Sequence, residues 1–221
     1  MNIFDFGFVI PLLAEAKPLL QQITHRKRHK SASWEMYTGI LFDKKISLII
    51  SGSGKIKSAA ATQFLIDAFP AKQYIHYGTA GAISSKLNIG DIVVATRVIE
   101  HDVIELFPHK IPPPHHKITP PNLKNIMLNN DFSLVWGTIL SGNEDVISTK
   151  RKHQLHRLHK GLSVDWESAG FALTCELNGV VGYIFRGISD NAYEHTASEY
   201  GKNQNLVVTN IMHLLKGFFT V

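Results

Sequence analysis

Acidic residues flank predicted strands at three places in this chain, and they are the residues best suited to acid–base chemistry. Asp190 follows the apolar run 180–185, which is typical of a buried strand. Glu15 opens a predicted helix after the first strand, and Asp165-Trp166-Glu167 begins another helix after a short strand. In open α/β folds ligands bind where strands end, and a carboxyl group backed by apolar residues can become a proton donor. One sheet edge could therefore collect these groups for catalysis, although each could also be only a turn former or helix cap.

Two glycine-rich stretches follow predicted strands and indicate close approach of backbone to a ligand. Ser51-Gly52-Ser53-Gly54-Lys55 lacks the upstream glycine and the Ser/Thr after Lys of a phosphate-binding loop. It also lacks the third glycine of a dinucleotide fingerprint. Gly78-Thr79-Ala80-Gly81 consists of small residues that leave N–H groups open. We expect both stretches to be turns that hold one ligand at the same sheet edge.

Strand-like and helix-like patterns alternate along the chain, which predicts an α/β fold with a mixed, mostly covered sheet. No linker or repeat divides the sequence, so we expect a single domain, 1–221. The expected strands are 4–13, 36–42, 46–51, 73–77, 91–100, 133–140 and 180–186, with a hairpin turned at Asp43-Lys44. The expected helices are 14–23, 55–68, 149–159, a helix after Ser163-Val164 that runs through Glu176, and 203–218, while 106–121 is proline-rich and irregular.

The chain is basic, with a net charge of +5 and a pI of about 9.2. The positive charge is concentrated in 25–30 and 150–160. These clusters could bind phosphates nonspecifically, but no nucleic-acid module accompanies them and aromatic residues are not interleaved. We therefore interpret 25–30 as a solvated loop and 150–160 as the exposed face of a helix.

Cysteine and histidine usage, together with the lack of a long apolar segment, bears on whether the protein is secreted, membrane-bound or metal-binding. The single cysteine, Cys175, excludes an internal disulfide framework and favours a reducing compartment. The apolar run 6–13 lacks the preceding positive charges of a signal peptide, and no segment has the ~20 apolar residues of a membrane span. The histidines form no zinc-binding pattern, and those in 153–159 have cationic neighbours. We expect a cytoplasmic protein without a metal ion or cofactor.

The motifs, taken in order, resemble the nucleoside phosphorylase/nucleosidase family and, within it, the methylthioadenosine/S-adenosylhomocysteine nucleosidases. The resemblance spans nearly the whole chain and rests on Ala14-Glu15-Ala16, 51–55, 78–81, Ile89-Gly90-Asp91-Ile92-Val93-Val94, His101-Asp102-Val103, Ser141-Gly142, 164–169 and 186–190. It implies a three-layer α/β/α sandwich around a mixed sheet. It also implies a role in methionine salvage and a homodimer in which the partner completes the pocket.

The resemblance also implies a role for each acidic group in cleavage of an N-ribosidic bond. Asp190 would be the general acid toward purine N7, and Glu15 would hold and activate the attacking water. Glu167 would bind the ribose hydroxyls and stabilise positive charge on the sugar. Trp166 stands where the family often has Met and could pack against the ribose. The remaining substrate-binding residues would be Asp165, Gly78, Thr79, Ala80, Gly81, Val146, Ile147 and Ser189.

Hydrolysis is favoured over phosphorolysis at one position. Phosphorylases of this family usually place an arginine before the Gly-Thr/Ser turn, where this chain has His76. Phosphate recognition favours the bidentate fork of arginine. Arg26 and Arg28 could still reach the site from the predicted basic loop, so phosphorolysis is the alternative.

Some departures from the family bear on the substrate. The aromatic residue that nucleosidases use to stack on adenine is replaced within Asn143-Glu144-Asp145, and 107–114 is unusual in the loop that helps close the pocket. Tyr193 and Tyr200 are the candidate lid aromatics. We expect hydrolysis of a 5′-modified adenosine. A futalosine hydrolase and a noncatalytic nucleoside- or nucleic-acid-binding protein are the alternatives.

Overall fold

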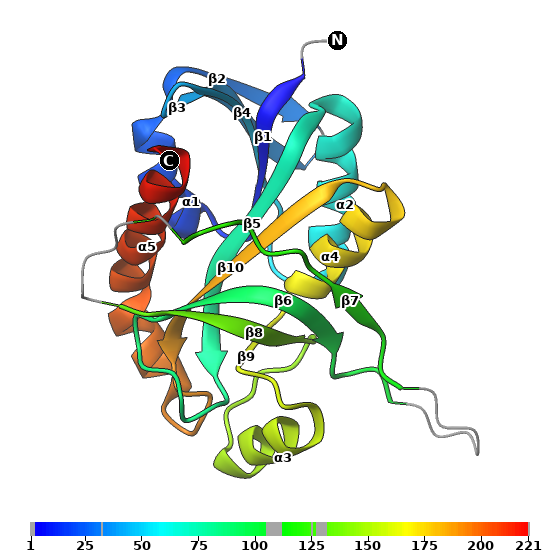
Figure 1. Ribbon diagram of the computed structural model, residues 1–221, viewed down its shortest axis with the longest axis vertical. Helices are drawn as coiled ribbons and strands as arrows, with labels where there is room; N and C mark the ends of the chain where they lie inside the picture. Colours follow the sequence, from blue (N-terminus) through cyan, green and yellow to red (C-terminus); the bar gives the residue numbers. More distant parts are fainter. Residues whose placement is uncertain (1–2, 32, 105–111, 125, 127–131, 221) are drawn as a thin grey trace.

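The part of the chain that the structure describes forms a ten-stranded mixed sheet, and helices cover both of its faces (Figure 1). The computed structural model describes residues 3–31, 33–104, 112–124, 126 and 132–220. The strands are β1 (Phe4–Ile10), β2 (Thr24–Ser31), β3 (Trp34–Leu41), β4 (Lys44–Ile50), β5 (Ala71–Ala82), β6 (Ile92–Glu100), β7 (His115–Lys117), β8 (Leu134–Ser141), β9 (Ser163–Asp165) and β10 (Val181–Asp190). The helices are α1 (Leu13–Gln22), α2 (Lys55–Ala68), α3 (Thr149–His159), α4 (Ser168–Leu177) and α5 (Thr196–Thr220).

The pairing of the strands brings three strand ends to one edge of the sheet. β5 lies in parallel between β1 and β10, so the carboxyl ends of all three strands point the same way. β10 also pairs with β6, and β5, β9, β8, β6 and β10 therefore close into a ring of strands. In the β5–β10 register, Asp190 lies opposite Gly81. The fold thus places Asp190 beside the small residues that end β5.

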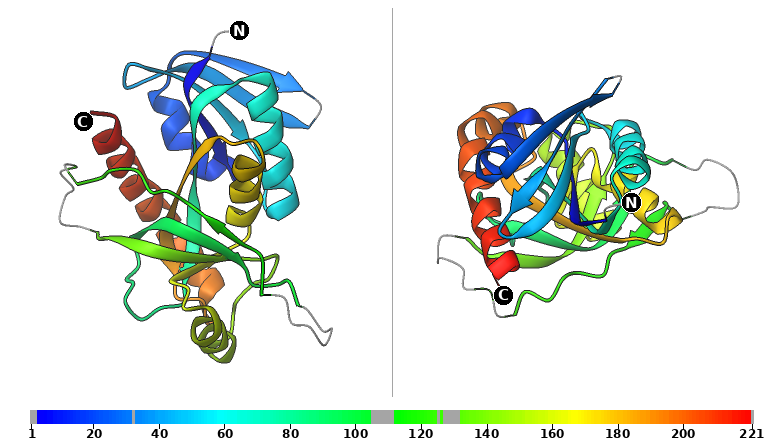
Figure 2. Two further views of the ribbon diagram at one scale, coloured as in Figure 1. Left: turned by 45° about the vertical axis from the view of Figure 1, so that its right-hand side comes forward. Right: turned by 90° about the horizontal axis from the view of Figure 1, so that it is seen from above.

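Two hydrophobic layers hold the sheet between its helices. α1 and α5 cover one face, and α2 and α4 cover the other (Figure 2). Alternate residues of β1 serve the two layers because successive strand side chains point to opposite faces. Phe8 and Ile10 pack with α1 and α5, whereas Val9 packs with α2 and α4. The structure confirms the predicted three-layer α/β/α sandwich.

Two sequence predictions about local structure are wrong. The basic stretch 25–30 is not a loop but belongs to β2, which pairs with β3 at the edge of the sheet and is exposed along most of its length. Charged side chains suit such a strand because they discourage pairing with another chain. Gly78 to Gly81 is not a turn either, because these residues continue β5 and pair with β10.

Most other elements follow the sequence prediction closely. α2 and α3 begin and end where expected, and α3 exposes most of its basic face. The hairpin turns at Phe42 and Asp43, both with positive φ (46° and 60°), as two-residue hairpin loops require. α5 begins at Thr196, before the predicted start. Of the predicted irregular segment, 115–117 forms β7, and 106–111 lies outside the described residues.

The structure bears on the expected inert thiol of Cys175 and on the expected lack of a membrane span. Cys175 is buried against the sheet, and burial raises the pKa of its thiol to about 12. A thiol with such a pKa is a poor nucleophile. Within the described ranges, no helix combines the length and the apolar character needed to cross a bilayer.

Candidate active site

A cavity of about 380 Å³ opens where β1, β5 and β10 end. Its size falls within the range of ligand pockets, roughly 300–1,000 Å³. All of the site residues predicted from the sequence line it except Gly78, which lies beneath it. Tyr200 from α5 also contributes to the wall, whereas Tyr193 does not line it and donates its hydroxyl to Glu199 (2.9 Å). The cavity therefore brings together side chains from both halves of the chain.

Glu15 lies in the first turn of α1 with its carboxylate buried at the end of β5. The Thr79 N–H and hydroxyl donate to Oε1 (2.8 and 2.9 Å), and the Leu12 N–H donates to Oε2 (3.3 Å). Burial raises the pKa of Glu15, while the Thr79 hydrogen bonds and the charge of Arg186 oppose the rise. The result is an oriented carboxylate with an elevated pKa, which suits a general base.

Asp190 ends β10 and faces the same cavity. Its Oδ2 accepts the Ser189 hydroxyl (2.8 Å), and its Oδ1 accepts the Ala192 N–H (3.0 Å). Burial raises the pKa of Asp190, and these hydrogen bonds limit the rise. A carboxyl group whose protonated form is favoured by burial can act as a general acid.

Glu167 is the N-cap residue of α4 and accepts the Gly54 N–H at Oε1 (3.0 Å). The predicted glycine-rich stretch 51–55 thus contributes its backbone to this carboxylate, and Lys55 is held by Glu100 and Asp102 (2.7 and 2.6 Å). Burial raises the pKa of Glu167 to about 7.

The Asp165 carboxylate is engaged in hydrogen bonds and an ion pair with other groups of the protein. Its Oδ1 accepts the N–H groups of Glu167 and Ser168 (3.2 and 3.1 Å) at the start of α4, and its Oδ2 pairs with Arg186 Nε (2.6 Å). Asp165 therefore fixes the helix start that presents Glu167. Although Asp165 lines the cavity, both of its carboxylate oxygens are thus engaged by protein groups.

Arg186 is a functional candidate to which the sequence reasoning assigned no role. It is fully buried in β10, and its Nε also donates to Ser168 (3.1 Å). Nη1 is buried without a hydrogen-bond partner in the described part of the chain. A Cβ on Gly78 would collide with Nη1 and lie 3.2 and 3.3 Å from the Glu15 oxygens. Arg186 Nη1 and the Glu15 carboxylate therefore both lie next to Gly78.

A sequence signal for Arg186 was present. The residue interrupts an apolar strand between Phe185 and Gly187, and a buried arginine needs buried partners. A strand predicted to be covered on both faces therefore predicts acidic or polar neighbours around Arg186, and the nearest candidates were the carboxylates already assigned to the site.

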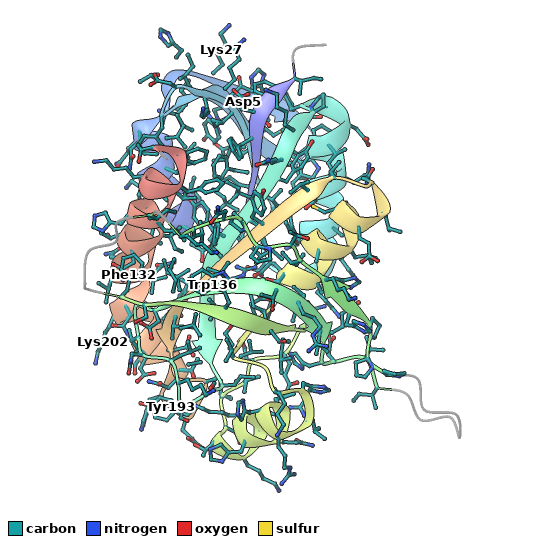
Figure 3. All side chains as sticks on the ribbon, viewed as in Figure 1. Asp5, Lys27, Phe132, Trp136, Tyr193 and Lys202 are labelled. Atoms are coloured by element: carbon teal, nitrogen blue, oxygen red, sulfur yellow. The ribbon has the colours of Figure 1, made fainter. Side chains whose placement is uncertain are left out.

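The three residues considered for phosphate binding, His76, Arg26 and Arg28, do not line the cavity. His76 is buried in β5 and stacks on Phe171 (ring centroids 5.0 Å apart). Arg28 pairs with Glu35 (2.9 Å), and Arg26 donates to the Leu20 carbonyl (2.5 Å). Lys27, on the basic strand β2, and Tyr193, three residues after Asp190, lie toward opposite ends of the molecule (Figure 3). Neither arginine lines the cavity.

The wall expected to face the base carries acidic rather than aromatic side chains. Glu144 and Asp145 line it together with Val146 and Ile147. Arg151 holds Glu144 through two hydrogen bonds of 2.7 Å each, and Trp166 Nε1 donates to the Glu144 carbonyl (3.0 Å). Trp166 is therefore the large aromatic surface next to this segment.

Gly81 gives a direct test of how closely the site is packed. A Cβ at this position would lie 2.7 Å from Asp190 Oδ1 and 3.1 Å from the Ala192 Cβ. We expect Gly81→Ala to displace Asp190 and lower kcat/KM for a cleaved nucleoside by about 100-fold, the cost of a misplacement of about 1 Å. Gly201→Ala is the control, since a Cβ there meets nothing within 4 Å. Equal kinetics for the two variants would contradict the packing argument.

Comparison with known proteins defines the class. A model of the phosphorylase superfamily matches residues 5–220, and the chain belongs to this superfamily. It is 30% identical over 199 residues to the 5′-methylthioadenosine/S-adenosylhomocysteine nucleosidase of Exiguobacterium, covering 85% of each chain. It is 32% identical over 173 residues to the aminodeoxyfutalosine nucleosidase of Helicobacter pylori strain J99, covering 74% and 75% of the two chains.

Solved structures agree on the fold. The 5′-methylthioadenosine/S-adenosylhomocysteine nucleosidase from Helicobacter pylori, in complex with butyl-thio-DADMe-Immucillin-A, superposes with a TM-score of 0.88. The two chains are 24% identical, and the match covers 100% of each. This likeness extends the family relationship to the three-layer architecture.

Proposed function

We propose that this protein hydrolyses the N-ribosidic bond of a 5′-modified purine nucleoside, with 5′-methylthioadenosine and S-adenosylhomocysteine as its substrates. The observation that carries the proposal is the convergence of Glu15, Glu167 and Asp190 on one cavity. Each has a raised pKa, and each is held by defined hydrogen bonds. The named activities of the relatives support the same reaction.

The three carboxyl groups divide the chemistry between the two ends of the breaking bond. Asp190 donates a proton to purine N7, so that the base leaves as a neutral molecule while the C1′–N9 bond breaks. The sugar becomes oxocarbenium-like, and Glu167 binds its hydroxyls and stabilises its positive charge. Glu15 takes a proton from the water that attacks C1′. Arg186 Nη1 has no hydrogen-bond partner among the described residues and lies near Glu15, which makes it a candidate second group to hold that water.

Charge on the cavity wall supports water rather than phosphate as the nucleophile. Among the described residues that line the cavity there is no Lys, Arg or His, and the charged ones are Glu15, Glu144, Asp145, Asp165, Glu167 and Asp190. Phosphate sites use arginine forks or other cationic groups. A carboxylate-lined wall repels a phosphate dianion, whereas it accepts a water molecule and a developing cation.

The names of the relatives support the choice of purine base and 5′ substituent in the proposed substrate. Both relatives are named for nucleosides that carry a 5′ substituent, and one acts on aminodeoxyfutalosine. Futalosine hydrolysis is therefore the second candidate. The family resemblance points to a homodimer, in which a partner would cover exposed apolar side chains such as Ile56, Val103 and Ile104. We place the enzyme in the cytoplasm.

A nucleoside panel tests the proposal. We expect the purified protein to release adenine from 5′-methylthioadenosine and S-adenosylhomocysteine, measured by chromatography of the free base. Aminodeoxyfutalosine, adenosine and inosine complete the panel and separate the futalosine alternative from a general purine nucleosidase. Binding of these nucleosides without release of any base would contradict the proposed hydrolysis and favour a noncatalytic nucleoside-binding protein.

A further inference from the structure

His76 does not line the cavity, but within the described part of the chain it is hydrogen-bonded to Arg186 behind the site. The imidazole is fully buried and stacked on Phe171 at an interplanar angle of 20°. Its Nδ1 lies 2.7 Å from the Val9 carbonyl oxygen, and its Nε2 lies 2.6 Å from Arg186 Nη2. Both ring nitrogens are therefore engaged, one with the backbone of β1 and one with a guanidinium.

These two partners determine the protonation of the ring. A carbonyl oxygen can only accept, so Nδ1 must carry a proton. A guanidinium can only donate and stays charged, so Nε2 must offer its lone pair. Burial and the charge of Arg186 lower the pKa of His76 well below its ordinary value, which agrees with a neutral ring. His76 is thus a neutral hydrogen-bond acceptor toward Arg186.

The His76 acceptor determines which groups the other N–H donors of Arg186 can face. Asp165 and Ser168 hold the Nε edge, and His76 holds Nη2. Glu167 Oε2 is the next acceptor for Nη2, at the longer distance of 3.5 Å. With His76 in place, Arg186 keeps Nη1 toward Glu15, and Glu167 is not locked in a short ion pair. Without this acceptor, Nη2 would turn toward Glu167.

We propose that His76 is a positioning residue for the reaction, which holds Arg186 toward the water site and leaves Glu167 free to bind the ribose. This inference rests on the proposed function. It predicts that loss of the acceptor lowers nucleoside binding as well as turnover, because Glu167 would become occupied by Arg186 while Nη1 moves away from Glu15.

Two substitutions separate positioning from packing. The carboxamide of His76→Asn reaches as far as Nδ1 and can still donate to the Val9 carbonyl, but it does not reach Arg186. The longer side chain of His76→Gln places its oxygen near the position of Nε2 and restores the acceptor. We expect His76→Asn to lower kcat/KM for 5′-methylthioadenosine by about 10- to 100-fold, the value of a hydrogen bond to a charged group, with a raised KM as part of the loss. His76→Gln should recover most of it.

The outcomes distinguish the inference from the function on which it rests. Equal kinetics for the Asn and Gln variants, or losses that follow the fraction of folded protein in thermal melts, would show that His76 only packs. A wild-type protein that releases no base would instead contradict the proposed function. A readout independent of activity is the ¹⁵N spectrum of the imidazoles, with His76 assigned by its absence in His76→Asn. A protonated Nδ1 and an unprotonated Nε2 are expected, and an Nε2–H form or an imidazolium at neutral pH would overturn the inference.

Discussion

Replacing Asp190 with Asn is expected to lower kcat for 5′-methylthioadenosine by about 100- to 10,000-fold, the usual contribution of a general acid. Asn cannot protonate purine N7, so the base would have to leave as an anion. The amide has nearly the shape of the carboxyl group. Its oxygen can still accept the Ala192 N–H, and its NH2 group can donate to the Ser189 hydroxyl, which reverses the direction of that hydrogen bond. Substrate binding should therefore change far less than turnover, as measured by single-turnover kinetics and equilibrium binding.

The matched control is Asp91→Asn, which removes a carboxylate that is equally buried, with 5% of its surface exposed at both positions. Asp91 accepts the N–H groups of Asn88 and Ser133 (2.8 and 2.9 Å) and does not line the cavity. We expect it to affect stability rather than chemistry. A turnover of Asp190→Asn similar to that of Asp91→Asn would remove Asp190 from the mechanism.

Glu15→Gln is expected to have the second large effect, again about 100- to 10,000-fold on kcat, because the attacking water loses its base. The pH dependence gives an additional signature. A base must be ionised, and burial raises the pKa of Glu15, so kcat/KM should fall as the pH is lowered through that pKa. The Gln variant should lose the part of this acidic limb that Glu15 governs. Measurement of kcat/KM across the acidic range for both proteins tests the assignment.

Two other groups titrate in the same cavity and must be separated from Glu15. Glu167, with a pKa of about 7, adds to the acidic limb, whereas Asp190 must be protonated and its ionisation lowers the rate as the pH rises. A Glu15→Gln variant with wild-type kcat and an unchanged profile would show that another group activates the water.

The sequence predicted the positions of the carboxylates well because local chemistry determines them. Asp190 ends an apolar strand, and Glu15 and Asp165 stand at helix starts, where carboxylates are favoured by the free N–H groups. In a sheet with parallel strands these junctions gather at one edge, and the structure places them around one cavity. The order of the motifs then indicated a family, and the match of the superfamily over residues 5–220 confirms it.

Other features depended on partners far away in the chain. β2 has charges on both faces and carries no alternating pattern, so only its pairing with β3 shows that it is a strand. The glycines of 78–81 predicted a turn, but pairing with β10 keeps them extended. His76 and Arg186 meet across 110 positions, and no local rule places them together. In each case the structure depends on contacts between residues that are far apart in the sequence, which local patterns do not reveal.

The sugar product reveals whether water or phosphate attacks the sugar, and we expect water. Wild-type protein is incubated with 5′-methylthioadenosine in saturating phosphate, and the sugar is identified by mass spectrometry. The carboxylate-lined cavity predicts free methylthioribose and a rate that is unchanged when phosphate is left out. Formation of methylthioribose 1-phosphate, with no adenine released in the absence of phosphate, would show that the protein is a phosphorylase.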